Sequence, residues 1–411
     1  MRLFERLRGL LANEKGNVLV LAAAAMPLIV GSAGLAVDTI QLSLLKRHLQ
    51  RAADSGALAG AYAKAQDQGF DIEDAVDKAL GFNDAFPLST AETFQPTTGT
   101  FANRSVRVRL TATRSLPFMS FFTSTAPVIT VEATAALVYS GQYCMIALDE
   151  SSATGITFGG NATVNMGCGI ISNTTGAAAV GVNGNASSVT ASPIAAVGGV
   201  PSSRVYQQPT LLLPYSLKQD DPFADLPDPP SFPTCSPKMV DSTTPTPGCY
   251  LGLDVNGTKT LPPGTYYLKG DLKLNANSVL NAPGVTFVFT SDTPTDASSL
   301  PKIEIDGSAT LNLTAPTSGT FEGVAMYYDR RTVASSPGPK IEGNSTSSFE
   351  GAFYFPTQNV TFRGNSNMAT DCIQLVAFQL TFEGNTVINN DCDDEDGGAS
   401  AFDATWVRLV G

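Results

Sequence analysis

The sequence predicts a mainly β protein with a long N-terminal transmembrane α-helix, and three observations support this fold class. Residues 17–37 form an uncharged apolar run that is long enough to cross a hydrocarbon core. Helical periodicity continues beyond this run, whereas the later chain carries short alternating strand patterns separated by Gly, Ser, Thr and Asn. A Gly-Asn motif recurs about every 20 residues in the C-terminal part, which is typical of stacked coils.

Composition limits the function classes that the chain can serve. It has 411 residues, 37 acidic and 25 basic, for a net charge of −12. No sustained Lys/Arg cluster follows the first fifty residues, so we expect no nucleic-acid partner. The only histidine is His48, which leaves the later chain without Ser-His-Asp, Cys-His or histidine metal sites. We therefore predict no enzyme and no cofactor.

The apolar run Asn17–Val37 is interpreted as a retained membrane span. A cleavable signal peptide is the alternative, because Ala22–Ala25 resembles a cleavage site, but the apolar run continues through Val37 and ends only at Asp38. Positive charge before a span holds that end in the cytoplasm. Residues 1–15 are thus predicted to be cytoplasmic, with a single pass and the bulk of the chain periplasmic or extracellular. The basic residues in that segment are Arg2, Arg6, Arg8 and Lys15.

Beyond Asp38 a stripe of apolar and small residues recurs at steps of three and four, which predicts that the helix continues past the membrane. The predicted packing face consists of Leu42, Leu45, Leu49, Ala52, Gly56, Ala59 and Ala63. Gly56 and Gly60 have G-x-x-x-G spacing, which permits close approach of another backbone or sheet. Packing against the protein's own sheet is the favoured interpretation, and a dimer seam is the alternative.

Six cysteines lie beyond the span, and none has C-x-x-C spacing. They are Cys144, Cys168, Cys235, Cys249, Cys372 and Cys392. An even number of cysteines on the exported side fits disulfides in an oxidising compartment. The sequential pairs 144/168, 235/249 and 372/392 would each close a modest loop, although six cysteines allow about 15 pairings. Free buried thiols are the alternative.

Three stretches near the N-terminus resemble a known family. They are Lys15-Gly16-Asn17-Val18, Gly34-Leu35-Ala36-Val37-Asp38 and Leu49-Gln50-Arg51-Ala52-Ala53-Asp54-Ser55-Gly56-Ala57-Leu58-Ala59-Gly60-Ala61. Together they resemble the N-terminal region of TadE/TadG-like Flp pilus-assembly proteins over roughly residues 13–65. The resemblance implies a pilin-like helix over 16–65 in a bacterial inner membrane and a role in building or anchoring tight-adherence pili. It also implies partners among pilus-assembly proteins or pilin, and in the cell wall or outer membrane.

Two departures limit what the resemblance transfers. Prepilin peptidase sites have Glu at the fifth position after the glycine, whereas Gly16 is followed there by Leu21. Some TadG-like proteins carry a D-x-S-x-S metal site, but in the segment that begins at Asp149 the second serine is replaced by Ala153. We therefore expect neither processing after Gly16 nor a metal-dependent adhesion site.

Residues 66–140 are predicted to form a small α+β module. Asp71–Leu80 has a helical pattern with one apolar face. Val106, Val108 and Leu110 alternate with polar residues, and Val128–Tyr139 is rich in β-branched side chains, so both segments are expected to be strands packed on the long helix.

Residues 141–411 are predicted to form a repetitive domain that resembles a right-handed parallel β-helix, with a β-sandwich as the alternative. The repeated turns are Gly160-Asn161, Gly184-Asn185, Ala276-Asn277, Gly307-Ser308, Gly343-Asn344, Gly364-Asn365 and Gly384-Asn385. Strands such as 361–363 and 380–382 should pair in register and stack Phe362 and Phe382 inside, while asparagines form ladders along the turns. The Pro- and Asp-rich segment 219–247 is expected to be an irregular loop stapled by Cys235 and Cys249.

Two groups of carboxylates could carry chemistry, and for both we favour solvated turn residues. Asp306, Glu342 and Glu383 occupy analogous turns, so an acidic ladder of an envelope carbohydrate-active enzyme is conceivable. The acidic run 391–396 fails the calcium-loop register. The predicted function is a membrane-anchored, non-enzymatic component of Flp pilus assembly or its envelope anchoring. A surface adhesin or carbohydrate-binding stalk that uses the same anchor is the alternative.

Overall fold

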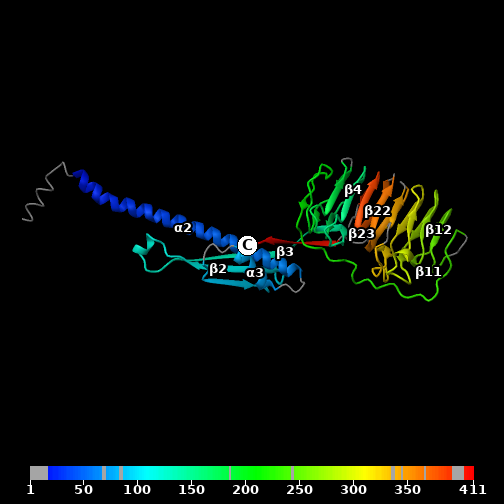
Figure 1. Ribbon diagram of the computed structural model, residues 1–411, viewed down its shortest axis with the longest axis horizontal. Helices are drawn as coiled ribbons and strands as arrows, with labels where there is room; N and C mark the ends of the chain where they lie inside the picture. The colour runs from blue at the N-terminus through cyan, green and yellow to red at the C-terminus, as the bar shows by residue number, and fades with distance from the viewer. Residues whose placement is uncertain are drawn as a thin grey trace, which may run out of the picture. The chain divides into compact units, whose positions relative to one another are not determined.

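The computed structural model describes residues 17–66, 71–82, 87–184, 187–241, 245–334, 338–343, 346–364, 367–390 and 402–411. It is mainly β with one long apolar N-terminal helix (Figure 1). The chain divides into two compact units. Unit 1 contains the chain up to Val138 together with Val407–Gly411, and unit 2 is Tyr139–Trp406.

Unit 1 packs two helices on an antiparallel sheet in the order β1, β2, β3. Its elements are α2 (Asn17–Gln66), α3 (Ile72–Gly81), β1 (Thr90–Phe94), β2 (Ser105–Thr113), the 3₁₀ turn η2 (Met119–Phe121) and β3 (Val128–Ala147), whose second half belongs to unit 2. Asp71 caps α3 by accepting a hydrogen bond from the Glu73 N–H. The alternation predicted for β2 is observed, because Val106, Val108 and Leu110 are all buried.

The two halves of α2 have opposite environments. Its first half is apolar yet exposed, as at Leu28, which is 75% exposed. Its second half is buried against α3, β2 and β3, as at Leu45, which is 1% exposed. α2 is long and apolar enough to cross a membrane. A bilayer around the first half would remove this apolar surface from water, which suggests a membrane anchor.

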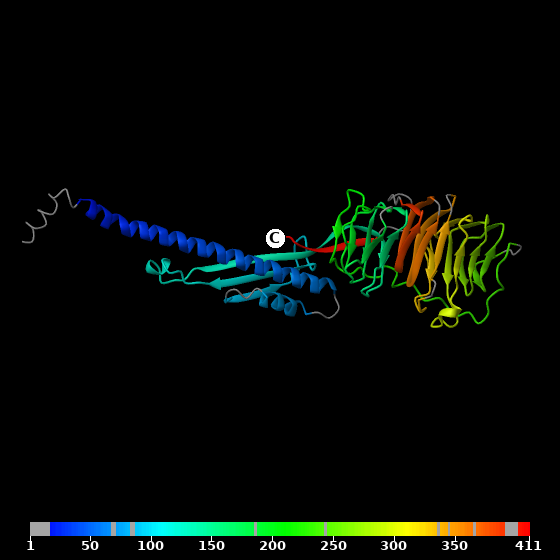
Figure 2. The ribbon, with the colours of Figure 1, turned by 45° about the horizontal axis from the view of Figure 1, so that its top comes forward.

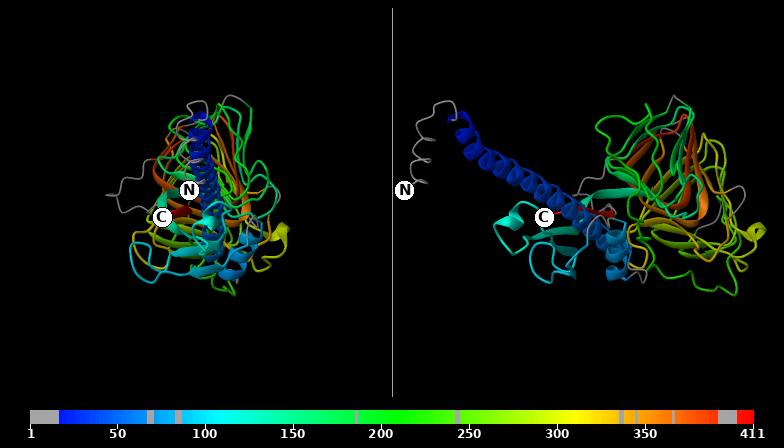
Figure 3. Two further views of the ribbon diagram at one scale, coloured as in Figure 1. Left: turned by 90° about the vertical axis from the view of Figure 1, so that its left-hand side faces the viewer. Right: turned by 60° about the vertical axis from the view of Figure 1, so that its left-hand side comes forward.

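Unit 2 consists of parallel strands that form three ladders, in which each strand pairs with the equivalent strand of the next coil (Figures 2 and 3). Ladder 1 contains β10 (Leu212–Leu213), β9 (Ile194–Ala196), β6 (Gly169–Ser172), β3, β23 (Asn367–Gly384), β22 (Ser348–Gly364), β20 (Val324–Tyr328), β17 (Val285–Phe289), β14 (Gly264–Leu268) and β11 (Gly248–Tyr250). Ladder 2 contains β7 (Val180–Asn183), β4 (Ile156–Gly159), β23, β22, β21 (Lys340–Gly343), β18 (Ile303–Ile305), β15 (Leu272–Leu274) and β12 (Leu253–Val255). Ladder 3 contains β8 (Ser188–Thr190), β5 (Thr163–Asn165), β24 (Val387–Asn390), β23, β22, β19 (Thr310–Thr314), β16 (Val279–Pro283) and β13 (Thr258–Thr260).

The coils do not stack in sequence order. β3, β4 and β5 form the first coil, and each of them pairs with the following coil on one side and with the last coil, in β23 and β24, on the other. Figure 2 shows the orange-red strands of the last coil beside the green strands of the first. The chain therefore enters the stack in its middle, winds to one end, crosses to the other end and winds back. It leaves through β25 (Phe402–Leu409), after which the Val410 N–H donates to the Thr134 carbonyl in unit 1.

The crossing segment, called the strap, comprises the described residues 214–241 and 245–247, and Phe223, Leu226 and Phe232 place its first half over the outer face of ladder 1. The outer face of ladder 1 is apolar, and Phe223 of the strap packs on Tyr354 with ring centroids 5.2 Å apart. Arg330 donates to the carbonyls of Phe223, Ala224 and Leu226. Both faces of ladder 1 are thus buried, as is usual for parallel sheets. Among the described residues of the predicted irregular loop 219–247 there is no named helix or strand, and Cys235 is bonded to Cys249.

Side chains that point inward from the three ladders form the main core of unit 2. The predicted pairing of 361–363 with 380–382 is confirmed, because Thr361 pairs with Thr381 and Phe362 with Phe382. The rings of Phe362 and Phe382 stack with centroids 5.3 Å apart. A short 3₁₀ turn, η3 (Ala297–Ser299), lies in the connection between β17 and β18.

Candidate functional site

The structure places the predicted packing face of α2 against unit 1 itself. Of its seven residues, five are buried, and Leu42 and Ala59 are half-buried. The buried members are Leu45, Leu49, Ala52, Gly56 and Ala63. The stripe is wider than the predicted face, because Ala53, Ala57, Gly60 and Ala61 are also buried. Small side chains on both sides of the a/d positions let α2 lie flat on a sheet rather than along a narrow coiled-coil seam.

The two glycines of the G-x-x-x-G spacing contact α3 and β2. A methyl group added at Gly60 would lie 2.8 Å from Val76 Cγ2 and 2.9 Å from Val106 Cγ1. At Gly56 the nearest atom, Val76 Cγ1, would be 3.4 Å away. Gly60 is thus required for the close approach of α3 and the sheet, and this face of the helix is occupied within unit 1.

Two of the predicted disulfides are confirmed, Cys144–Cys168 and Cys235–Cys249. The first links β3 to the chain just before β6, in adjacent coils. No cysteine among the described residues is free, and Cys392, the predicted partner of Cys372, lies outside them. Disulfides of this kind are typical of chains folded outside the reducing cytosol.

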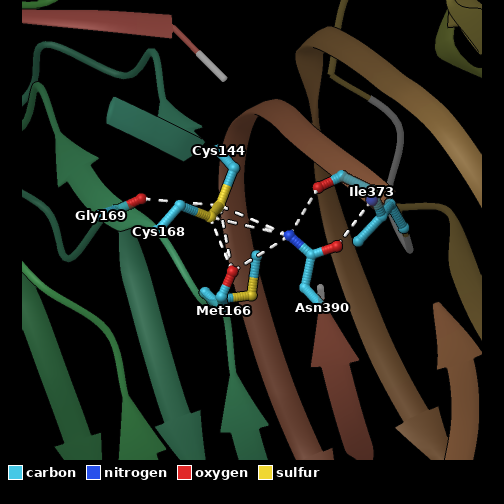
Figure 4. The surroundings of a disulfide bond; sticks show 6 residues. All are labelled: Cys144, Met166, Cys168, Gly169, Ile373 and Asn390. Carbon is cyan, nitrogen blue, oxygen red and sulfur yellow. Dashed lines mark hydrogen bonds between the residues drawn. A yellow bond between two sulfur atoms is a disulfide. The ribbon is translucent and has the colours of Figure 1, made fainter. Parts of the chain in front are cut away.

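Asn390, the final residue of β24, joins the last coil to the first disulfide (Figure 4). Its Oδ1 accepts from the Ile373 N–H at 2.7 Å, and its Nδ2 donates to the carbonyls of Met166 and Ile373 at 3.2 Å. The same Nδ2 lies 3.6 Å from Cys144 Sγ and 3.7 Å from Cys168 Sγ. Its side-chain oxygen and both donors of the amide are therefore satisfied in a buried position, which fixes where the last coil meets the first.

The turn asparagines reinforce this junction. Asn161 Nδ2 donates to Asn385 Oδ1 at 2.9 Å, although the two residues are separated by 224 positions. The preceding residues Gly160 and Gly384 have φ of 65° and 72°, a conformation that favours glycine. A methyl group at Gly160 would also lie 2.8 Å from the Gly384 carbonyl oxygen. Asn185, Asn344 and Asn365 of the predicted turns lie outside the described residues.

The far end of the stack is closed by residues 236–241 of the strap. Ser236 and Met239 form parallel bridges to Tyr250 and Leu253, and Cys235–Cys249 staples the segment to β11. Lys259 points inward in the last strand of this end coil, and its Nζ donates to the Val240 carbonyl at 2.8 Å. Burial lowers the pKa of Lys259. These contacts satisfy polar groups at an end that would otherwise expose apolar coil interior.

The outer face of ladder 2 carries charges that alternate in sign from strand to strand. One row pairs Asp254 with Lys273, Lys273 with Glu304 and Glu304 with Lys340. A cleft of about 350 Å³ lies over this face, and its charged lining residues are Lys273, Lys302, Glu304, Asp306, Lys340 and Glu342. Opposite charges on neighbouring strands stabilise the sheet and leave little net charge to attract an ion.

The three carboxylates considered as a catalytic ladder, Asp306, Glu342 and Glu383, lie on this face. Glu383 and Asp306 each accept hydrogen bonds from a different neighbouring residue. Glu383 accepts a hydrogen bond from Arg363 Nη2 at 2.6 Å, and Glu342 pairs in register with the same Arg363. The Ser308 hydroxyl and N–H donate to Asp306 and lower the pKa of that carboxyl. A general acid requires a raised pKa, so this arrangement suits ion pairing and turn capping better than proton donation.

Asp149, considered as a metal ligand, serves as a turn cap. Its carboxylate accepts from the Ser151 N–H and hydroxyl, both at 2.8 Å, and from Gln379 Nε2 at 2.6 Å. The searched, described residues contain no group of three or more His, Cys, Asp or Glu positioned to hold a metal ion. The acidic run 391–396 lies outside those residues, and His48 lies exposed on α2.

The outer face of ladder 3 carries a neutral row that sequence reasoning missed, here called the amide row. In spatial order it contains Thr260, Asn281, Asn312, Ser348, Asn389, Asn165 and Thr190, with Ala369 between Ser348 and Asn389 in register. Asn312 Nδ2 donates to Asn281 Oδ1 at 2.8 Å, and the Ser348 hydroxyl donates to Asn312 Oδ1. The sequence signal that could have found the row is an alternation within the strands, in which two outward-pointing polar residues are separated by one inward-pointing apolar residue.

The chain has no match among curated proteins and none among solved structures. The family model "Putative Flp pilus-assembly TadE/G-like" matches residues 16–65, which coincide with α2 except for Gly16 at the start and Gln66 at the end. The N-terminal region that forms the apolar helix and its packing face therefore matches the TadE/G-like Flp pilus-assembly family.

Proposed function

We propose that this protein is a single-pass, non-enzymatic component of Flp pilus assembly or of its envelope anchoring. The match of residues 16–65 to the pilus-assembly family carries the proposal. In this account α2 tethers the chain in a bacterial inner membrane with residues 1–15 in the cytoplasm, and the rest is exported. The exposed apolar first half of α2 and the two disulfides support this topology.

The exported unit 2 is, in this proposal, a right-handed parallel β-helix. Three parallel ladders with equivalent strands in successive coils support it, whereas a β-sandwich would be built from antiparallel hairpins. Nearly all parallel crossovers are right-handed. Such a stack offers a rigid, elongated surface to pilus, cell-wall or outer-membrane partners, while residues 236–241 of the strap cover β11 and β12 at one end.

The absence of catalysis is also a proposal, and it is supported by the pairing of the candidate carboxylates. Glu383 is bound to Arg363, and the pKa of Asp306 is lowered rather than raised. Neutralising either carboxylate, as in Glu383→Gln or Asp306→Asn, should leave pilus formation unchanged. Hydrolysis of an envelope glycan by the purified protein that disappears in either variant would contradict the proposal.

The decisive experiment is deletion of the gene and complementation. Deletion should abolish Flp pili counted by electron microscopy, and the full chain should restore them. A second complementing gene replaces residues 1–37 by a cleavable export signal, so that unit 2 is exported and oxidised but not tethered, and it should fail to restore pili. Normal pilus numbers in the deletion strain would contradict the proposed function.

A carbohydrate-binding stalk is the second candidate, and the amide row favours it. Amides and hydroxyls repeated at the strand spacing of about 4.8 Å are the groups that hydrogen-bond sugar hydroxyls. Binding of the full chain to envelope glycans, lost in Asn281→Ala/Asn312→Ala but kept in Thr381→Ala on ladder 2, would support this candidate. Equal binding by both variants would contradict it.

A further inference from the structure

The connection between β2 and β3, residues 115–127, is an uncharged segment that exposes two phenylalanines; it is called the tip. Its sequence is Ser-Leu-Pro-Phe-Met-Ser-Phe-Phe-Thr-Ser-Thr-Ala-Pro. Phe121 is 83% exposed and Phe122 is 75% exposed. Adjacent exposed aromatic side chains on a loop without charge are uncommon on a water-facing surface and typical of interaction sites.

The tip docks on α2 at the end of the apolar run. A methyl group built on Gly34 would lie only 2.1 Å from Phe118 Cδ1, so the Phe118 ring rests directly on this glycine. One helical turn later the Met119 N–H donates to Asp38 Oδ2 at 2.6 Å, and Asp38 is buried. The tip is therefore held on α2 by its contacts with the first and last residues of the Gly34–Asp38 motif.

The position of these contacts fixes the depth of the tip relative to a membrane. Asp38 is the first charged residue after the run 17–37, so it marks the outer boundary of the span. Gly34 lies about 6 Å deeper, given the rise of an α-helix. Segments that lie in the headgroup region bury their apolar side chains to about 5–10 Å. The Phe118 ring is thus held at the level where interfacial aromatic residues are found.

The apolar surface of the span continues into the tip. The span exposes apolar side chains up to Leu35 and Val37, beside the Gly34 and Asp38 contacts, and the tip adds Phe121 and Phe122. Figure 3 shows the cyan β2–β3 connection extending along the blue helix. A bilayer around α2 would meet both surfaces together.

We propose that the tip inserts Phe121 and Phe122 into the outer headgroup region of the bilayer that α2 crosses. The inference rests on the proposed membrane topology. It gives unit 1 two attachment points, the helix and the tip, so that the β-sheet is held at a set angle on the membrane instead of swinging about a single helix. The Gly34–Asp38 motif then has a defined role: glycine admits the Phe118 ring, and aspartate fixes the backbone of η2.

Depth-dependent fluorescence quenching tests the proposal with the full chain in phospholipid vesicles. The single tryptophan is first removed by Trp406→Phe, and a reporter is placed by Phe121→Trp. The matched control is Phe82→Trp, because Phe82 is 82% exposed and follows α3, away from the tip. Lipids brominated near the headgroups should quench the reporter at 121 by about twofold and leave the reporter at 82 unchanged.

A second variant separates docking from insertion. Gly34→Leu displaces the Phe118 ring but keeps the span apolar, so the quenching at position 121 should be lost while the protein stays in the membrane after carbonate washing. In the reporter protein that keeps Gly34, resistance to carbonate without lipid quenching at position 121 would overturn the tip proposal alone. Shielding of that unquenched reporter from aqueous acrylamide would assign the surface to a contact with a second copy of the chain instead. Release of the protein by carbonate would overturn the membrane topology and the tip proposal together.

Discussion

Phe382 is the residue whose removal most sharply tests the unusual chain order of unit 2. Its ring is fully buried between Phe362 of the preceding coil and Phe158 of the first coil, with centroids 5.3 Å and 5.4 Å away. In a stack wound in sequence order, the first and last coils would lie at opposite ends, and Phe158 would not touch Phe382. The Phe158–Phe382 contact therefore exists only if the last coil closes on the first.

Phe382→Ala should destabilise unit 2 by about 3–5 kcal/mol, the usual cost of deleting a buried phenylalanine ring. The corresponding fall in Tm is about 10 °C for a domain of this size. The matched control Phe82→Ala deletes the same atoms from an exposed position and should change stability by less than about 0.5 kcal/mol. The unfolding free energies of the two variants are measured by urea unfolding of the full chain in detergent. Unfolding is followed by the far-ultraviolet circular dichroism of the β-structure.

A double-mutant cycle with Phe158→Ala isolates the contact between the coils. Stacked aromatic pairs are coupled by about 0.5–1.5 kcal/mol beyond their buried area. Distant residues in one domain are additive to within about 0.3–0.5 kcal/mol. A coupling energy below that limit, or equal costs for Phe382→Ala and Phe82→Ala, would refute the closure of the last coil on the first.

Three further predictions concern the strap and its anchors. Arg330→Lys should expose the strap to limited proteolysis although the charge is kept, because a single ammonium replaces the two guanidinium nitrogens that together reach the three carbonyls; unchanged cleavage would contradict this. Burial raises the pKa of Asp329, but hydrogen bonds from Arg331 outweigh it, so the pKa of the folded protein lies below the unfolded value. Asp329→Asn should thus cost about 3 kcal/mol at pH 7, and its difference from wild type should shrink as the pH falls below about 4 in urea titrations. Cys235→Ser should lower the unfolding free energy by about 3 kcal/mol, and a difference that persists between the two proteins under reducing conditions would argue against the staple.

The elements set by local periodicity were predictable from the sequence. The long helix, the α3 segment and the alternation at Val106–Leu110 follow from apolar spacing, which reports directly on a buried face. The stacking of Phe362 on Phe382 was predictable for the same reason, because the turns on either side repeat at a constant interval.

The order of the coils was not predictable, because each coil offers equivalent strands and equivalent inward side chains. Nothing in the turn at Gly160-Asn161 distinguishes a neighbour in the next coil from one at Gly384-Asn385. The abundance of proline and aspartate predicts an irregular loop in the strap, but it does not predict the path of the strap over ladder 1, because its anchor Arg330 lies about one hundred residues away. Long-range partners of this kind leave no periodic signal.

In the candidate site too, local patterns were predictable from the sequence and long-range contacts were not. The small residues of α2 were recognised, but periodicity cannot say which surface covers them, and the observed occupants are Val76 and Val106 of the same unit. The contact of Gly34 with Phe118 was not recognised either, since it joins two segments that are adjacent only after the β2–β3 hairpin folds back along the helix.

Protease accessibility in spheroplasts shows whether residues 17–37 tether the chain with its bulk outside, on which the proposed function depends. With an epitope placed before Asn17, added proteinase should digest the chain beyond Asp38 and leave a small, epitope-bearing membrane fragment that is cut only after lysis. A chain that stays intact in spheroplasts, or that is recovered in the soluble cytosolic fraction with Cys144 and Cys168 reduced, would contradict this topology.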